Sequence, residues 1–107
     1  MNAKTVTHHN ITFDGETLEK FCRENGIKKL SLFGSVLRDD FRPESDIDML
    51  VEFLPGEVVG FFRISRTERA LSSIFNGEKI DLRTPEDLSD YFRDKVVAES
   101  EELYVQR

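Results

Sequence analysis

Residues 46–53 (Asp-Ile-Asp-Met-Leu-Val-Glu-Phe) constrain the fold more than any other segment, because an apolar run begins with two aspartates. A short run of this kind, followed by the turn residues Pro55-Gly56, is typical of a strand. On a strand, Asp46 and Asp48 point to the same face, with their backbones roughly 6–7 Å apart. Ile47 and its alternate neighbours then point to the core. The segment predicts a sheet with one buried face and one face that presents carboxylates.

The segments around this strand predict an alternation of helices and strands. Apolar spacing indicates helices over residues 15–25, 60–75 and 84–96, a short helix over 35–40, and strands over 28–33 and 78–83. The connection from the strand at 28–33 to that at 46–53 is too short for a parallel crossover. We therefore expect an α/β (α+β) fold, with a small mixed three- to four-stranded sheet flanked by helices.

The turns and chain ends are less sharply defined. Asn76-Gly77 resembles a hairpin-type turn after the second long helix. Thr84-Pro85 is a strong start for the last helix, with Thr84 as N-cap and proline in the first turn. Residues 1–13 either fray or form an extended arm through Ile11 and Phe13. Residues 100–107 either continue the last helix or reach a partner.

Composition limits the possible classes of protein. The 107 residues fit a single domain, residues 1–107, with a core over about 15–97. The net charge of -6 argues against direct nucleic-acid binding, which relies on cationic side chains, but it permits a nucleotide held through cations. Cys22 is the single cysteine, so no intramolecular disulfide forms, and we expect it to be buried. A single cysteine suits the reducing cytoplasm, where we expect this protein, and no apolar run is long enough to span a membrane.

Asp81 supplies a third carboxylate. It lies in the strand at 78–83 with an apolar residue on each side, and a carboxylate there is costly unless it is paired or binds a metal. If this strand neighbours the one with Asp46 and Asp48, three carboxylates meet, which suits Mg²⁺ and phosphoryl or nucleotidyl transfer. The alternatives are an edge-strand aspartate paired with Lys79 or Arg83, and a solvated face at the start of the strand at 46–53.

Gly34-Ser35 follows an apolar strand and opens the short helix. Glycine allows the backbone to approach a ligand closely, and free N–H groups at a helix start attract phosphate. By itself the pair is more typical of a simple helix cap. Neither a Walker loop nor a Gly-x-Gly-x-x-Gly motif is present in the sequence.

The combination of these elements is more specific than any of them alone. Residues 32–38 (LFGSVLR), 45–51 (SDIDMLV) and 80–82 (IDL) together resemble the signature of the DNA polymerase beta-like nucleotidyltransferases, and of their minimal nucleotidyltransferase branch. The resemblance covers about residues 15–97. It implies the nucleotidyltransferase fold and an attack by an acceptor hydroxyl on the alpha-phosphate of a nucleoside triphosphate.

The resemblance also implies roles for individual residues. Gly34 and Ser35 would hold the triphosphate. Asp46 and Asp48 would bind Mg²⁺, and Asp81 would complete the metal site and help to deprotonate the acceptor. All three aspartates are thus expected to be catalytic.

Two arginines near this motif are further nucleotide-binding candidates. Arg38 and Arg42 are expected to approach the phosphates, although each is equally consistent with a solvated or ion-paired arginine. Where family members often carry glycine after the first of these arginines, this chain has Asp39, which adds an acid near the phosphate loop.

The minimal branch resembles antitoxins that are paired with HEPN-domain ribonuclease toxins. This resemblance implies transfer of AMP from ATP to a tyrosine of a cognate HEPN toxin. The alternatives are an antitoxin that acts by binding alone, and a nucleotidyltransferase that acts on a small molecule or RNA. A homo- or hetero-oligomer is compatible with exposed aromatics at Phe61-Phe62. His8-His9 is expected to be inert, and Tyr91 and Tyr104 are expected to serve packing or the surface rather than self-modification.

Overall fold

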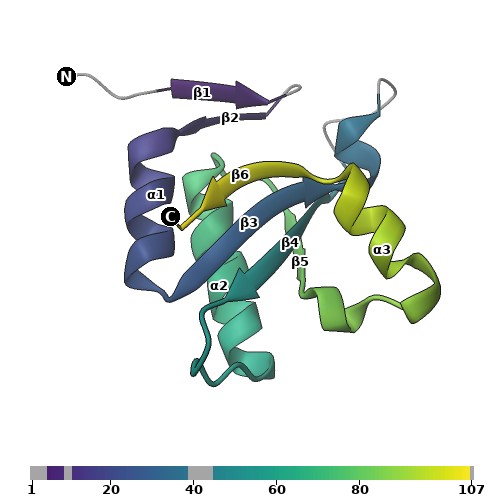
Figure 1. Cartoon of the computed structure of the whole chain (residues 1–107). Coiled ribbons are helices and arrows are strands. Elements are labelled where there is room, and N and C mark those ends of the chain that lie inside the picture. Colours follow the sequence, from purple (N-terminus) through teal and green to yellow (C-terminus); the bar gives the residue numbers. More distant parts are fainter. Residues whose placement is uncertain (1–4, 9–10, 39–44, 107) are drawn as a thin grey trace.

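The computed structural model describes residues 5–8, 11–38 and 45–106. The elements occur in the order β1 (Thr5–His8), β2 (Ile11–Asp14), α1 (Gly15–Glu24), β3 (Ile27–Phe33), the 3-10 helix η1 (Gly34–Leu37), β4 (Ile47–Phe53), α2 (Phe61–Ile74), β5 (Ile80–Arg83), the 3-10 helix η2 (Pro85–Asp87), α3 (Asp90–Glu99) and β6 (Glu101–Val105). Figure 1 shows a central sheet with α2 behind it, α1 on one side and α3 on the opposite side. None of the helices in these ranges is long and apolar enough to cross a membrane.

The central sheet is four-stranded and mixed, as the sequence predicts. Its order is β5-β4-β3-β6. The pairs β3–β4 and β3–β6 are antiparallel, whereas β4 and β5 are parallel. The short connection through η1 joins the antiparallel pair, and α2 provides the longer crossover that a parallel pair requires.

The core forms between the sheet and the first two helices. Leu18 and Cys22 of α1 and Leu71 of α2 are buried, in the same cluster as the inward residues of β3, β4 and β5. Each large apolar side chain contributes about 1.5–3 kcal/mol when fully buried. Burial raises the pKa of the Cys22 thiol to about 12, so the expected small buried hydrophobe is confirmed.

The N-terminal segment is an ordered hairpin in which β1 and β2 pair antiparallel. Ile11 and Phe13 are buried, and the Phe13 ring lies 4.8 Å from that of Phe75 at the end of α2. The extended arm expected through these two residues is therefore confirmed at β2. The pairing with β1 was not expected from the sequence; Val6 of β1 lies opposite Phe13 and also packs against the core.

The C-terminal tail does not continue the last helix, because residues 101–105 form the edge strand β6. Ser100 adopts an extended conformation and ends α3. The following residues pair with the free edge of β3, and the Gln106 N–H donates to the Lys28 carbonyl at 2.8 Å. The tail forms a strand because β3 offers unpaired backbone groups there.

The single helix expected over 84–96 is divided in two. Thr84 precedes η2 as expected, with its N–H donating to Asp87 Oδ2 at 3.1 Å. Leu88 is extended, and Ser89 then caps α3 by accepting the Tyr91 N–H at 3.2 Å. The second N-cap restarts the chain in a new direction, which the continuous apolar spacing did not reveal.

The predicted hairpin-type turn at Asn76-Gly77 is instead a helix C-cap. Both residues have positive φ, at 63° and 84°. The Gly77 N–H donates to Ser72 O at 2.7 Å, and the Asn76 N–H donates to Ser73 O at 3.4 Å. This is the Schellman arrangement, which satisfies the last carbonyls of α2.

Candidate active site

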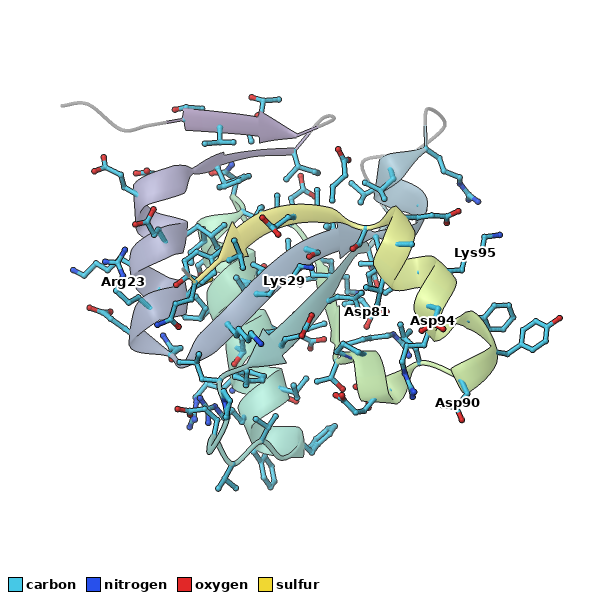
Figure 2. The ribbon with its side chains drawn as sticks, viewed as in Figure 1. Arg23, Lys29, Asp81, Asp90, Asp94 and Lys95 are labelled. Atoms are coloured by element: carbon cyan, nitrogen blue, oxygen red, sulfur yellow. The ribbon has the colours of Figure 1, made fainter. Side chains whose placement is uncertain are left out.

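Asp48 and Asp81 lie side by side on the parallel strands β4 and β5, where they occupy the same register. Register neighbours present their side chains on the same face of a sheet. The residues that flank them on each strand, such as Met49 and Leu82, are buried in the core on the other face. The expected adjacency of the two aspartate-bearing strands is therefore confirmed, and Figure 2 shows Asp81 on this part of the sheet.

Asp46 occupies a different position from the one predicted. β4 begins at Ile47, so Asp46 precedes the strand, and its side chain is exposed. It nevertheless acts electrostatically on Asp48. Within residues 5–8, 11–38 and 45–106, no group of three or more His, Cys, Asp or Glu side chains is gathered closely enough to hold a metal ion unaided. The structure thus brings together two of the three predicted carboxylates, with the third beside the strand start.

Negative charge is concentrated at Asp48. Burial raises the pKa of its carboxyl, and the neighbouring Asp81 raises it further through repulsion and a hydrogen bond between the two side chains. Asp46 adds repulsion, whereas the cation of Arg83 acts in the opposite direction. Without a bound cation, ionisation of Asp48 is therefore less favourable in the folded chain than in the unfolded chain.

This raised pKa predicts how the stability of the metal-free protein depends on pH. A folded-state pKa above the unfolded one means that the contribution of Asp48 to stability is present below the unfolded value, about 4, and is lost as pH rises through the folded value. Asp48→Asn should therefore raise Tm at pH 7 by about 2–4 °C, the effect of relieving a like-charge neighbour pair worth about 0.5 kcal/mol. Thermal melts from pH 3 to 8 should show this gain disappear at the acidic end.

Asp94→Asn is the matched control, since this aspartate is exposed on α3. It should leave Tm almost unchanged across the same range. A gain for Asp48→Asn that persists unchanged at pH 3 would contradict the linkage.

Gly34 lies directly against Asp48. Its φ is +78°, and a Cβ added there would overlap Asp48 Oδ2 and lie 3.3 Å from Cγ. Glycine is therefore favoured here for two reasons: the backbone is left-handed, and the Asp48 carboxylate occupies the space that a Cβ would need. Gly34 and Ser35 open η1 as expected, although this helix ends at Leu37 and is of the 3-10 type.

Of the two arginines predicted to bind phosphate, only Arg38 lies within the described residues. Arg38 follows η1 with an exposed side chain, and its N–H donates to Ser35 O at 3.0 Å. This places it at the exit of the Gly34-Ser35 turn. Arg42 lies outside the described residues, as do Asp39 and His9.

Two further residues shape the site on the β5 side. Arg83 Nη2 lies 3.4 Å from Asp81 Oδ2, so the ion pair considered as an alternative role for Asp81 is present, and β5 is an edge strand. Both side chains are partly exposed, and such a pair contributes little to stability. Glu68 of α2 accepts the Leu82 N–H at 2.7 Å, which satisfies the backbone at the open edge of β5. No local pattern marked Glu68, because its role depends on where α2 is placed.

The oxygen donors at this site fit a hard divalent cation that also contacts substrate phosphates. Mg²⁺ typically binds one or two protein carboxylates and completes its coordination with water and phosphate oxygens. Asp48 and Asp81 provide such a pair, and at Asp48 the repulsion from Asp81 outweighs the attraction of Arg83. The absence of a Cβ at Gly34 keeps the space next to Asp48 open.

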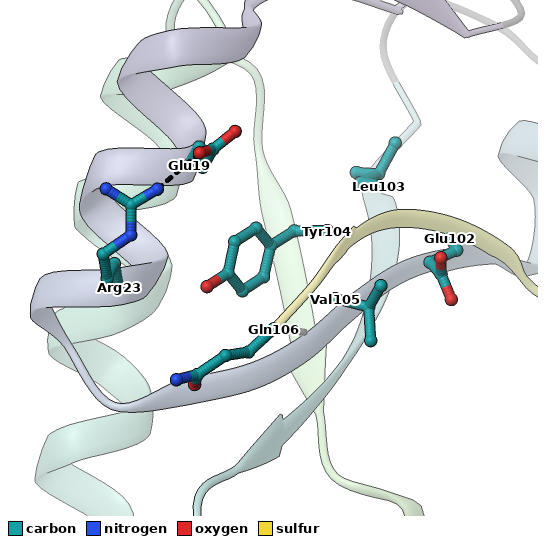
Figure 3. Close-up of a pocket in the computed structure, with 7 residues that line it drawn as sticks. All are labelled: Glu19, Arg23, Glu102, Leu103, Tyr104, Val105 and Gln106. Carbon is teal, nitrogen blue, oxygen red and sulfur yellow. Dashed lines mark hydrogen bonds and ion pairs between the residues drawn. The ribbon is translucent and has the colours of Figure 1, made fainter.

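A hollow of about 530 Å³ lies elsewhere, between α1 and β6. Figure 3 shows its lining, in which Arg23 forms an ion pair with Glu19 on α1 and Tyr104 faces them from β6. It shares no lining residue with the carboxylate site. Tyr104 packs partly against the core, in agreement with the packing role expected for it.

Residues 16–107 match the family model described as "Polymerase beta, Nucleotidyltransferase". The chain belongs to this family. A relative from Methanocaldococcus jannaschii, named "Putative protein adenylyltransferase", is 31% identical over 77 residues, which are 72% of this chain and 80% of the relative.

Solved structures share the nucleotidyltransferase fold. One, described as a "putative minimal nucleotidyltransferase", has a TM-score of 0.65 at 29% identity and covers 80% of this chain and 85% of its own. A toxin–antitoxin structure with AMP-PNP has a TM-score of 0.67 at 21% identity, over 88% of this chain and 75% of its own. A third is a tri-AMPylated Shewanella oneidensis HEPN toxin with its MNT antitoxin, with a TM-score of 0.59 at 21% identity. The match covers 86% of this chain and 70% of the matched chain.

Proposed function

We propose that this nucleotidyltransferase transfers AMP from ATP to a tyrosine of a cognate HEPN-type toxin and so acts as its antitoxin. The observation that carries the proposal is the placement of Asp48 and Asp81 at one register of a parallel strand pair, with Gly34 against Asp48. The relative named as a protein adenylyltransferase supports a protein acceptor. The structures with AMP-PNP and with an AMPylated HEPN toxin support ATP and this partner.

The residues have distinct roles in the proposed reaction. Gly34 and Ser35 bind the triphosphate, with Arg38 and Arg42 as additional contacts to phosphate. Asp46, Asp48 and Asp81 hold Mg²⁺, which supplies charge neutralisation at the phosphates when it is bound.

The proposed reaction needs only ATP and the tyrosine hydroxyl as reactants. The tyrosine oxygen forms a bond to the alpha-phosphorus, the bond from that phosphorus to the bridging oxygen breaks, and pyrophosphate leaves. Asp81 accepts the tyrosine proton. Catalysis of this kind consists mainly of positioning and charge stabilisation, so a small chain suffices.

The test combines the chain, ATP labelled in the alpha-phosphate, Mg²⁺ and the HEPN-type toxin proposed as its partner. We expect label on the partner, located by mass spectrometry on a tyrosine, and no label when EDTA is added. Neutralisation of the toxin without any label would instead indicate an antitoxin that acts by binding. Label on a small molecule or RNA, with none on the partner, would contradict a protein acceptor.

A further inference from the structure

A groove of about 470 Å³ runs beside Asp81, between the edge strand β5 and the first half of α2. Asp81 lines it, so the groove and the carboxylate site share this residue. Its apolar wall consists of Val59, Phe61, Ile64 and Leu82. The Phe61 side chain is 78% exposed. An exposed aromatic at the mouth of a groove is typical of a surface that binds a partner.

The polar lining of the groove is acidic. Glu68, Asp81 and Asp87 face a single cation, Arg83. Glu68 is held by the Leu82 N–H and Asp87 by the Thr84 N–H, so backbone groups fix the positions of both carboxylates. Asp81 is paired with Arg83, and Glu68 and Asp87 add negative charge to the rest of the lining, which disfavours the triphosphate of a nucleotide there. The groove is therefore suited to a different molecule from the one that the Gly34-Ser35 turn would hold.

We infer that this groove binds the acceptor segment of the partner, a tyrosine-bearing stretch with apolar and basic neighbours. The inference rests on the proposed function, because it assigns the acceptor side of the same site. Asp81 belongs to both the groove and the site, so a segment seated here brings its tyrosine hydroxyl to the residue that accepts the proton. Apolar neighbours of the tyrosine would contact Phe61 and Ile64, and basic ones would complement Glu68 and Asp87.

Charge also decides between possible occupants. A second copy of this chain carries a net charge of -6, so its approach to an acidic groove is opposed by repulsion. A basic partner gains from the same field. The surface therefore favours a positively charged acceptor over self-association.

The test uses two synthetic peptides, each with a central tyrosine flanked by leucines, one with arginines and the other with glutamates at its ends. Fluorescence anisotropy measures their binding to the whole chain, and labelled ATP with Mg²⁺ measures transfer to each. We expect the arginine peptide to bind at least tenfold more tightly than the glutamate peptide. Phe61→Ser should weaken its binding by about fivefold or more.

Phe62→Ser is the matched control. Phe62 is the next residue on α2, is 83% exposed and does not line the groove. Its replacement should leave the affinity for the arginine peptide unchanged. The inference is overturned if neither peptide binds, if both bind equally, or if the Phe61 and Phe62 variants behave alike.

Separate readouts distinguish this inference from the proposed function. Selective binding that depends on Phe61, without transfer to peptide or toxin, would overturn the proposed enzymatic function and leave the groove as a docking surface. Transfer to the toxin with an unchanged KM in Phe61→Ser would support the enzyme and overturn the groove as its acceptor site.

Discussion

Asp48→Asn is expected to abolish AMP transfer while making the metal-free chain more stable. Asp48 is the carboxylate that lies between Gly34 and Asp81, and its replacement removes a proposed metal ligand without removing volume. Loss of metal-assisted charge stabilisation, worth roughly 4 kcal/mol, corresponds to about a thousandfold lower rate. Initial rates of label transfer to the toxin, measured at saturating ATP, provide the test.

The combination of effects in this variant is diagnostic. A variant that merely unfolds has both lower activity and a lower Tm. Asp48→Asn should instead have lower activity and a higher Tm. Asp94→Asn, an exposed change on α3, should retain full activity. Wild-type rates in Asp48→Asn would exclude Asp48 from the reaction and leave the binding-only antitoxin as the better account.

Gly34→Ala is expected to cost both activity and stability. The new Cβ would overlap Asp48 Oδ2, and alanine at φ +78° adds strain of about 1–2 kcal/mol. The carboxylate, the backbone of η1 or both must then move. A displacement of about 1 Å in a catalytic group costs about a hundredfold in rate, so we expect at least this loss in label transfer.

Gly77→Ala separates strain from collision. Gly77 has a similar φ of +84°, but a Cβ there would meet no atom within 4 Å. This variant should show a comparable loss of stability, about 1 kcal/mol in urea unfolding, with wild-type activity. If the two variants had equal activity, the contact between Gly34 and Asp48 would be irrelevant to catalysis.

The carboxylate site illustrates how far local pattern extends. The apolar run at 46–53 and the apolar neighbours of Asp81 were sufficient to predict two strands, because burial imposes a readable alternation on each. The parallel register that sets Asp48 beside Asp81 depends on the crossover through α2. Asp46 fell outside β4 because strand ends depend on pairing, which begins here when Ile47 N–H donates to Lys79 O at 2.8 Å.

The C-terminal part of the chain shows the opposite case, in which the local pattern was insufficient to predict the structure. Residues 101–105 carry glutamates and apolar residues in an order that suits helix or strand about equally. Only the open edge of β3 made them β6. The break at Leu88-Ser89 was likewise hidden, because the apolar spacing continues across it while Ser89 caps a new helix.

By itself, the sequence determined that a glycine-serine turn opens a short helix after a strand and that three aspartates lie on or beside two strands, since these assignments depend on local burial and turn chemistry. It also determined the family, through the spacing of these residues. The tertiary structure alone decided that Asp48 and Asp81 share a register, that Gly34 lies against one of them, and that an acidic groove with Phe61 at its mouth adjoins the other. These features join segments distant in the chain, and they form only when the sheet and α2 bury their apolar faces together.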